Sequence, residues 1–67
     1  MKTYLISVYD LASCQVIGTN EFQADKKAAL KTYQETIDLL VGKDLKIALF
    51  ELKGNAWKGL KKHEKRN

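Results

Sequence analysis

The sequence predicts a small α+β domain in which an antiparallel sheet carries one helix on one of its faces. The chain has 67 residues, which suits a single domain. One segment repeats apolar residues at three- and four-residue steps, as a helix with one buried side does. Short runs rich in β-branched and aromatic residues stand before and after that segment, as strands do. Together these observations predict a ββαβ(β) arrangement.

The first two strands are expected to form a hairpin. Residues 3–9 are rich in β-branched and aromatic side chains, and residues 14–22 return after a turn at residues 10–13. Asp10 can accept a hydrogen bond from the backbone of this turn. Gly18 marks a candidate β-bulge in the returning strand.

The helix is expected over residues 25–41. Asp25 can cap its first turn, and Gly42 stands where a left-handed C-terminal cap is expected. One apolar stripe should face the core, and it consists of Ala29, Leu30, Tyr33, Ile37, Leu40 and Val41.

The last part of the chain supplies the rest of the sheet. A nearly continuous apolar run at residues 45–52 predicts a central strand, and the Gly54-Asn55 turn leads into a short fourth strand at residues 56–60. A right-handed crossover through the helix places the third strand beside the first. The expected strand order is therefore 2-1-3-4, with every neighbouring pair antiparallel. A β-grasp-like arrangement, with the last strand beside the first, is the alternative.

The net charge of +4 comes from the C-terminal end. Residues 1–57 contain seven lysines and seven acidic residues, whereas residues 58–67 contain five basic residues and one acidic residue. We therefore expect a neutral domain over residues 1–60 and a basic, flexible tail over residues 61–67. Removal of this tail should leave the melting temperature nearly unchanged.

Residues that usually carry catalysis are scarce. His63 is the single histidine and lies in a charged segment, where a shielded general base is not expected. Cys14 is the single cysteine, and we expect it to be a half-buried structural thiol in a strand. These two residues cannot build a zinc site of four protein ligands. The sequence therefore predicts no enzymatic activity, cofactor, metal or small-molecule substrate.

The same composition indicates a compartment. A lone cysteine cannot form an internal disulfide, which suits a reducing, cytoplasmic environment. No stretch approaches the roughly 20 apolar residues of a membrane span.

The first expected function is protein binding, as a regulator, an inhibitor, an assembly subunit or a homodimer. One helix covers one face of a sheet, while the central strands are apolar on both faces, so an apolar surface is left uncovered. The third strand contributes either Phe50 and Leu52 or Ile47 and Leu49 to this surface. The candidate interface residues are Leu5, Tyr9, Phe50, Leu52 and Trp57. Chains of this size are often accessory proteins of phages or other mobile elements, which favours a blocker of a larger protein.

The alternative function is nucleic-acid binding by the C-terminal end. Basic side chains there can neutralise phosphates, and Trp57 can stack on a base. The candidate residues are Trp57, Lys58, Lys61, Lys62, Lys65 and Arg66. The neutral remainder of the chain counts against this function, because nucleic-acid-binding domains usually spread basic residues over one face.

Overall fold

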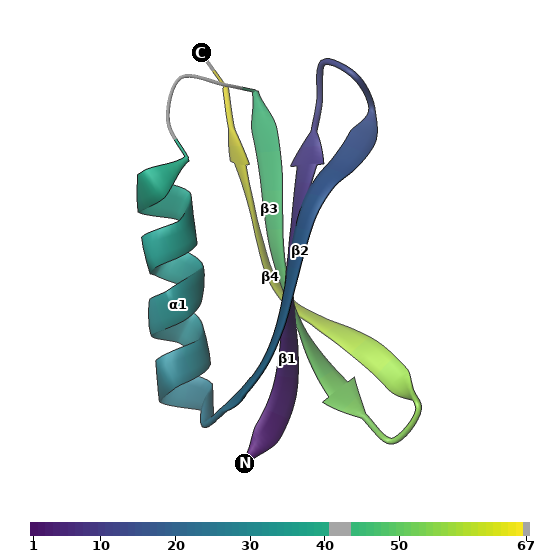
Figure 1. The fold of residues 1–67 in the computed structure, drawn as a ribbon, viewed down its shortest axis with the longest axis vertical. Coiled ribbons are helices and arrows are strands. Elements are labelled where there is room, and N and C mark those ends of the chain that lie inside the picture. Colours follow the sequence, from purple (N-terminus) through teal and green to yellow (C-terminus); the bar gives the residue numbers. More distant parts are fainter. Residues whose placement is uncertain (41–43, 67) are drawn as a thin grey trace.

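The computed structural model describes residues 1–40 and 44–66 and confirms the predicted α+β fold. Its elements are β1 (Lys2–Asp10), β2 (Gln15–Ala24), α1 (Lys26–Leu39), β3 (Leu45–Lys53) and β4 (Ala56–Lys65). The strands form one sheet in the order β2-β1-β3-β4, with each neighbouring pair antiparallel. Figure 1 shows α1 lying along one side of this sheet. The β-grasp-like alternative is wrong, because β4 pairs with β3 and not with β1.

The core lies between α1 and one face of the sheet. Alternate residues of β1 and β3 point into it, because successive side chains of a strand lie on opposite faces. Leu30 and Leu40, which the predicted helix stripe includes, are only partly buried at its margin. The buried apolar residues are Tyr4, Ile6, Ala29, Tyr33, Ile37, Leu45, Ile47 and Leu49.

The helix begins at the predicted cap. Asp25 has an extended backbone, and its Oδ1 accepts a hydrogen bond from the amide of Ala28 at 2.7 Å. This bond satisfies a first-turn amide that has no helical partner. The helix ends at Leu39, and the predicted positions of Val41 and Gly42 lie outside the described residues. Within residues 1–40 and 44–66, no helix combines the length and apolar character that a membrane crossing requires.

The outer strand β4 is longer than the sequence suggested. The β3–β4 hairpin turns at Gly54, whose φ of 59° costs glycine no steric strain. The strand then continues to Lys65, which pairs with Leu45. The prediction of a flexible tail over residues 61–67 is therefore wrong for residues 61–65, which belong to the sheet.

The β1–β2 turn is held by Asp10. The carboxylate of Asp10 accepts hydrogen bonds from the amide of Ala12 and the hydroxyl of Ser13, both at 3.0 Å, as expected for an aspartate at the start of a turn. Cys14 ends the turn with a φ of 58° and is exposed. The prediction of a half-buried thiol in a strand is therefore wrong.

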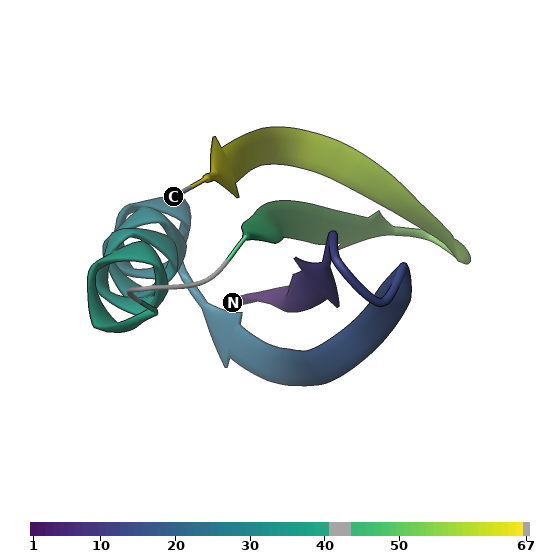
Figure 2. The ribbon, with the colours of Figure 1, turned by 90° about the horizontal axis from the view of Figure 1, so that it is seen from above.

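Each hairpin contains one β-bulge. The first lies beside Gly18, as predicted, where Ile17 of β2 has no partner residue in β1. The second leaves Leu60 of β4 without a partner residue in β3. Bulges increase the twist of a sheet. The two hairpin turns lie at opposite ends of the sheet (Figure 1), as the antiparallel pairing of β1 with β3 requires. Figure 2 shows β2 and β4 curving on either side of the central pair.

Candidate interaction surface

The side of the sheet that points away from α1 forms a second surface, which we call the open face. In β1, the buried residues Tyr4 and Ile6 alternate with open-face positions, and in β3 the fully buried Ile47 and Leu49 do the same. The open-face residues that pair between β1, β3 and β4 are Leu5, Ser7, Tyr9, Lys46, Ala48, Phe50, Leu52, Trp57, Gly59, Lys62 and Glu64.

The structure brings the predicted interface residues together on this open face. Ile47 and Leu49 belong to the core, so β3 contributes the other predicted pair, Phe50 and Leu52, to the open face. Leu5 stands opposite Phe50. Trp57 stands opposite Leu52 at the outer strand, where 40% of its surface is exposed. Three strands thus supply one apolar surface that α1 does not cover.

The open face is arranged in rows of side chains that cross the sheet, because paired residues of neighbouring strands stand side by side. The three central rows are Leu5–Phe50–Gly59, Ser7–Ala48–Lys62 and Tyr9–Lys46–Glu64. The middle row has the smallest side chains at the centre of the sheet. It therefore forms a trough between two rows of larger side chains, and we use the name trough for the surface over Ser7 and Ala48.

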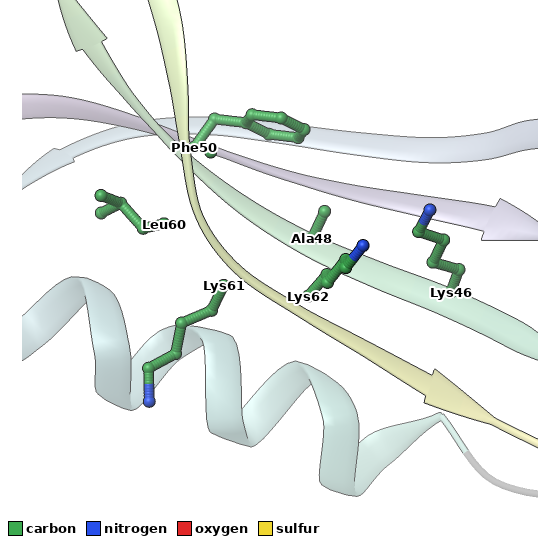
Figure 3. Close-up of a pocket in the computed structure, with 7 residues that line it drawn as sticks. Lys46, Ala48, Phe50, Leu60, Lys61 and Lys62 are labelled. Carbon is green, nitrogen blue, oxygen red and sulfur yellow. The ribbon is translucent and has the colours of Figure 1, made fainter.

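The trough contains two adjoining hollows of about 400 and 360 Å³. Lys46, Ala48 and Phe50 line both of them. Figure 3 shows these side chains and that of Lys62 extending to one side of the sheet, whereas Lys61 extends toward α1. The trough is thus bordered by an aromatic ring and two ammonium groups.

The basic residues of β4 do not share one surface. Lys58 and Lys61 stand opposite Glu51 and Leu49, which are buried, so both lysines lie on the helix side of the sheet. Lys62 lies on the open face. Of the nucleic-acid candidates in β4, the structure therefore brings only Lys62 to the same face as Trp57.

The remaining two basic candidates have partners within the chain. The Nζ of Lys65 donates a hydrogen bond to the carbonyl oxygen of Ile37 at 2.7 Å. Arg66 and Glu64 form an ion pair with 3.5 Å between Nη2 and Oε2. Both side chains of this pair are largely exposed, so solvent screens their attraction.

Sequence reasoning missed a buried acid. Glu51 is only 5% exposed, and its Oε1 lies 3.0 Å from the Nζ of Lys2. The hydrogen bond from Lys2 lowers the pKa of Glu51, and the same bond raises the pKa of Lys2. The alternation of buried and open-face residues along β3 could have indicated this burial, since Glu51 lies two residues after the core residue Leu49.

Titratable side chains add little reactive chemistry to the surface. Burial, with a smaller contribution from Cys14, raises the pKa of Tyr9, so its hydroxyl remains protonated and can donate a hydrogen bond. His63 is exposed in β4 on the helix side of the sheet, opposite Ile47. In the part of the chain that the structure describes, no three histidine, cysteine, aspartate or glutamate side chains gather to hold a metal ion.

Comparison with known proteins finds no relative of this chain. No protein-family model matches the chain, and neither the curated proteins nor the solved structures give a match.

Proposed function

We propose that this chain is a non-enzymatic binding protein that acts through a protein–protein contact on the open face. The observation that carries the proposal is the apolar surface formed by Leu5, Phe50, Leu52 and Trp57 on the sheet face that α1 does not cover. A contiguous apolar patch of this kind marks an interaction site in a small protein. The role is that of a regulator, an inhibitor or an assembly subunit, and the exposed lone cysteine suits the cytoplasm.

The charge distribution favours a protein over a nucleic acid as the partner. Pairing places Lys46 and Lys62 on the open face together with Glu64 of β4 and Glu21 of β2. The basic residues of this face are therefore too few for the several phosphate contacts that nucleic-acid binding requires. On the helix side, Lys65 is engaged with the carbonyl oxygen of Ile37, so the basic candidates of β4 that remain there for phosphates are Lys58 and Lys61.

The proposal is tested with Leu5→Glu. Leu5 lies on the open face in the central strand β1 and opposite Phe50, so a carboxylate there should disrupt an apolar contact while leaving the core intact. Tagged wild type and variant are incubated with nuclease-treated and untreated lysate of the native host, and captured proteins are identified by mass spectrometry. We expect a partner that wild type retains and Leu5→Glu loses.

The matched control is Lys27→Gln, which changes the charge by the same amount on the exposed side of α1. It should capture the partner as wild type does. Thermal unfolding should show both variants to be folded. Identical capture by wild type and a folded Leu5→Glu protein would contradict the proposal. Capture that nuclease treatment abolishes would favour nucleic-acid binding instead.

A further inference from the structure

We propose that the trough receives one bulky apolar side chain from an extended, acidic segment of the partner protein. This inference rests on the proposed function, because it specifies the kind of segment that the open face binds. It follows from the shape of the trough, the nature of its borders and the charges beside it.

The shape favours a narrow occupant. Rows that are two residues apart along a strand stand about 6.6 Å apart, so the Leu5–Phe50 and Tyr9–Lys46 rows are separated by about 13 Å at the backbone. Their side chains narrow this space further. An α-helix with its side chains is about 10–12 Å wide and does not fit between them. An extended segment, or a single large side chain inserted from above, does fit.

The border of the trough that Phe50 forms is open at the outer strand. Gly59 ends the Leu5–Phe50 row at β4, and a Cβ at this position would lie 3.8 Å from the ring of Phe50. Because glycine leaves this space free, the first hollow extends from Ala48 and Phe50 of β3 to Gly59 of the outer strand β4. The ring of Phe50 thus remains accessible from the side and can pack against an entering aromatic or leucine side chain.

The charges beside the trough favour acidic neighbours in the occupant. Lys62 lies in the trough row itself, and Lys46 lies in the adjoining row. The nearest acid, Glu64, is paired with Arg66 at 3.5 Å. Among the described residues, the lining of the first hollow contains lysines and no acidic residue, and the flexible stems of Lys46 and Lys62 allow their ammonium groups to reach carboxylates on either side of an inserted residue.

A nucleic acid is a less suitable occupant. A nucleic acid would bring phosphates toward Glu21 and Glu64, which share this face with the lysines. A protein segment can instead place its carboxylates only where the lysines are.

The test uses three short fluorescein-labelled peptides and the full chain. The first has a central phenylalanine flanked by aspartate and glutamate, the second replaces the phenylalanine with serine, and the third replaces the acids with lysine. Fluorescence polarisation at low salt measures binding. We expect the first peptide to bind at least about tenfold more tightly than either of the others, since each lacks one of the two required features.

Two variants with matched controls locate the binding site. Ala48→Leu fills the hollow, and Lys62→Glu reverses a charge beside it, so each should weaken binding of the first peptide about tenfold or more. Their controls are Ala28→Leu and Lys31→Glu, which make the same changes on exposed positions of α1. Both controls should bind as wild type does, and thermal unfolding should show all four variants to be folded.

Several results would overturn the inference. These are equal binding of the three peptides, wild-type binding by Ala48→Leu, or displacement of the peptide by oligothymidine. A concentration-dependent dimer in sedimentation velocity that Ala48→Leu abolishes would show that a second copy occupies the trough. If Leu5→Glu loses the cellular partner while Ala48→Leu retains it, the proposed function stands and only the inference about the acidic segment is wrong.

Discussion

Lys65 in β4 donates a hydrogen bond from its Nζ to the carbonyl oxygen of Ile37 in the last turn of α1, at a distance of 2.7 Å. The last carbonyl groups of a helix lack helical partners and lie at the negative end of its dipole. A lysine from another element therefore satisfies one of them and adds a favourable charge. The outer strand is thus held both by pairing with β3 and by contact with the helix.

We expect Lys65→Met to lower the free energy of unfolding by about 1 kcal/mol. The variant keeps most of the aliphatic stem but loses the charged donor, and the partial exposure of Lys65 limits the effect. Urea denaturation followed by circular dichroism measures the change. Lys62→Met is the control, because Lys62 points to the opposite face of the sheet. The free energy of unfolding of this control should stay within about 0.5 kcal/mol of the wild-type value. Equal stability of the two variants would mean that the Lys65 bond contributes nothing.

Deletion of residues 61–67 should destabilise the domain strongly. The deletion removes half of β4, including the partners of Leu45, Ile47 and Leu49, and so exposes one side of the buried strand β3. A domain of this size has only a few kcal/mol of stability to lose. We expect a melting temperature at least about 10 °C below that of wild type. An unchanged melting temperature would instead support the sequence-based prediction that residues 61–67 form a flexible tail.

Tyr4→Phe should leave the stability unchanged or raise it by up to about 1 kcal/mol. Tyr4 is fully buried, and among the described residues its hydroxyl has no hydrogen-bond partner. Its ring packs against Phe22, with 6.0 Å between the ring centroids, and the substitution preserves this contact. Removing an unsatisfied buried hydroxyl removes its desolvation cost. A loss above about 1 kcal/mol in urea denaturation would indicate that the hydroxyl does have a partner, such as a buried water.

Acid sensitivity should depend on Glu51. The hydrogen bond from Lys2 lowers the pKa of this carboxyl from its ordinary value of 4.5, although burial opposes the effect. The stabilising contribution is therefore present above the unfolded-state pKa and is lost as the pH falls through the lower, folded-state value. Wild type should lose more stability than Glu51→Gln between about pH 5 and about pH 3.

Denaturant titrations over this pH range, with the exposed Glu35→Gln as control, test the expectation for Glu51. The control should follow the wild-type curve, because Glu35 lies on the exposed side of the helix. Parallel pH curves for wild type and Glu51→Gln would show that the Lys2–Glu51 pair does not couple folding to pH.

The sequence predicted the central strands well because their environment imposes a strict alternation. Alternation requires Tyr4 and Ile6 to share one face of the sheet, and it requires the same of Leu45 and Ile47. The single predicted helix has one apolar side and can cover only one of the two faces. The outer half of β4 carries no comparable pattern. An edge strand pairs on one side only and can expose charged side chains on both faces. A run of lysines therefore resembles a solvated tail even where the backbone is fully paired to β3.

The composition of the open face could be predicted, but its arrangement could not. Alternation alone places Phe50 and Ala48 on one face. The rows depend on the register between strands, which is set by the turn at Gly54 and shifted by the bulge at Leu60. The sequence gives no direct measure of that shift. The separation of Lys61 from Lys62 onto opposite faces follows from alternation as soon as β4 is known to include them.

The strand order also has a kinetic consequence. β1–β2 and β3–β4 are hairpins between neighbours in the chain, whereas the central pair β1–β3 joins strands separated by all of β2 and α1. Closing a long loop costs more entropy than closing a hairpin, and long-range pairing slows folding. The slow step should therefore be the docking of the two hairpins along β1 and β3. The substitutions that slow folding most should then lie at Ile6 and Leu49, which face each other across that central pair.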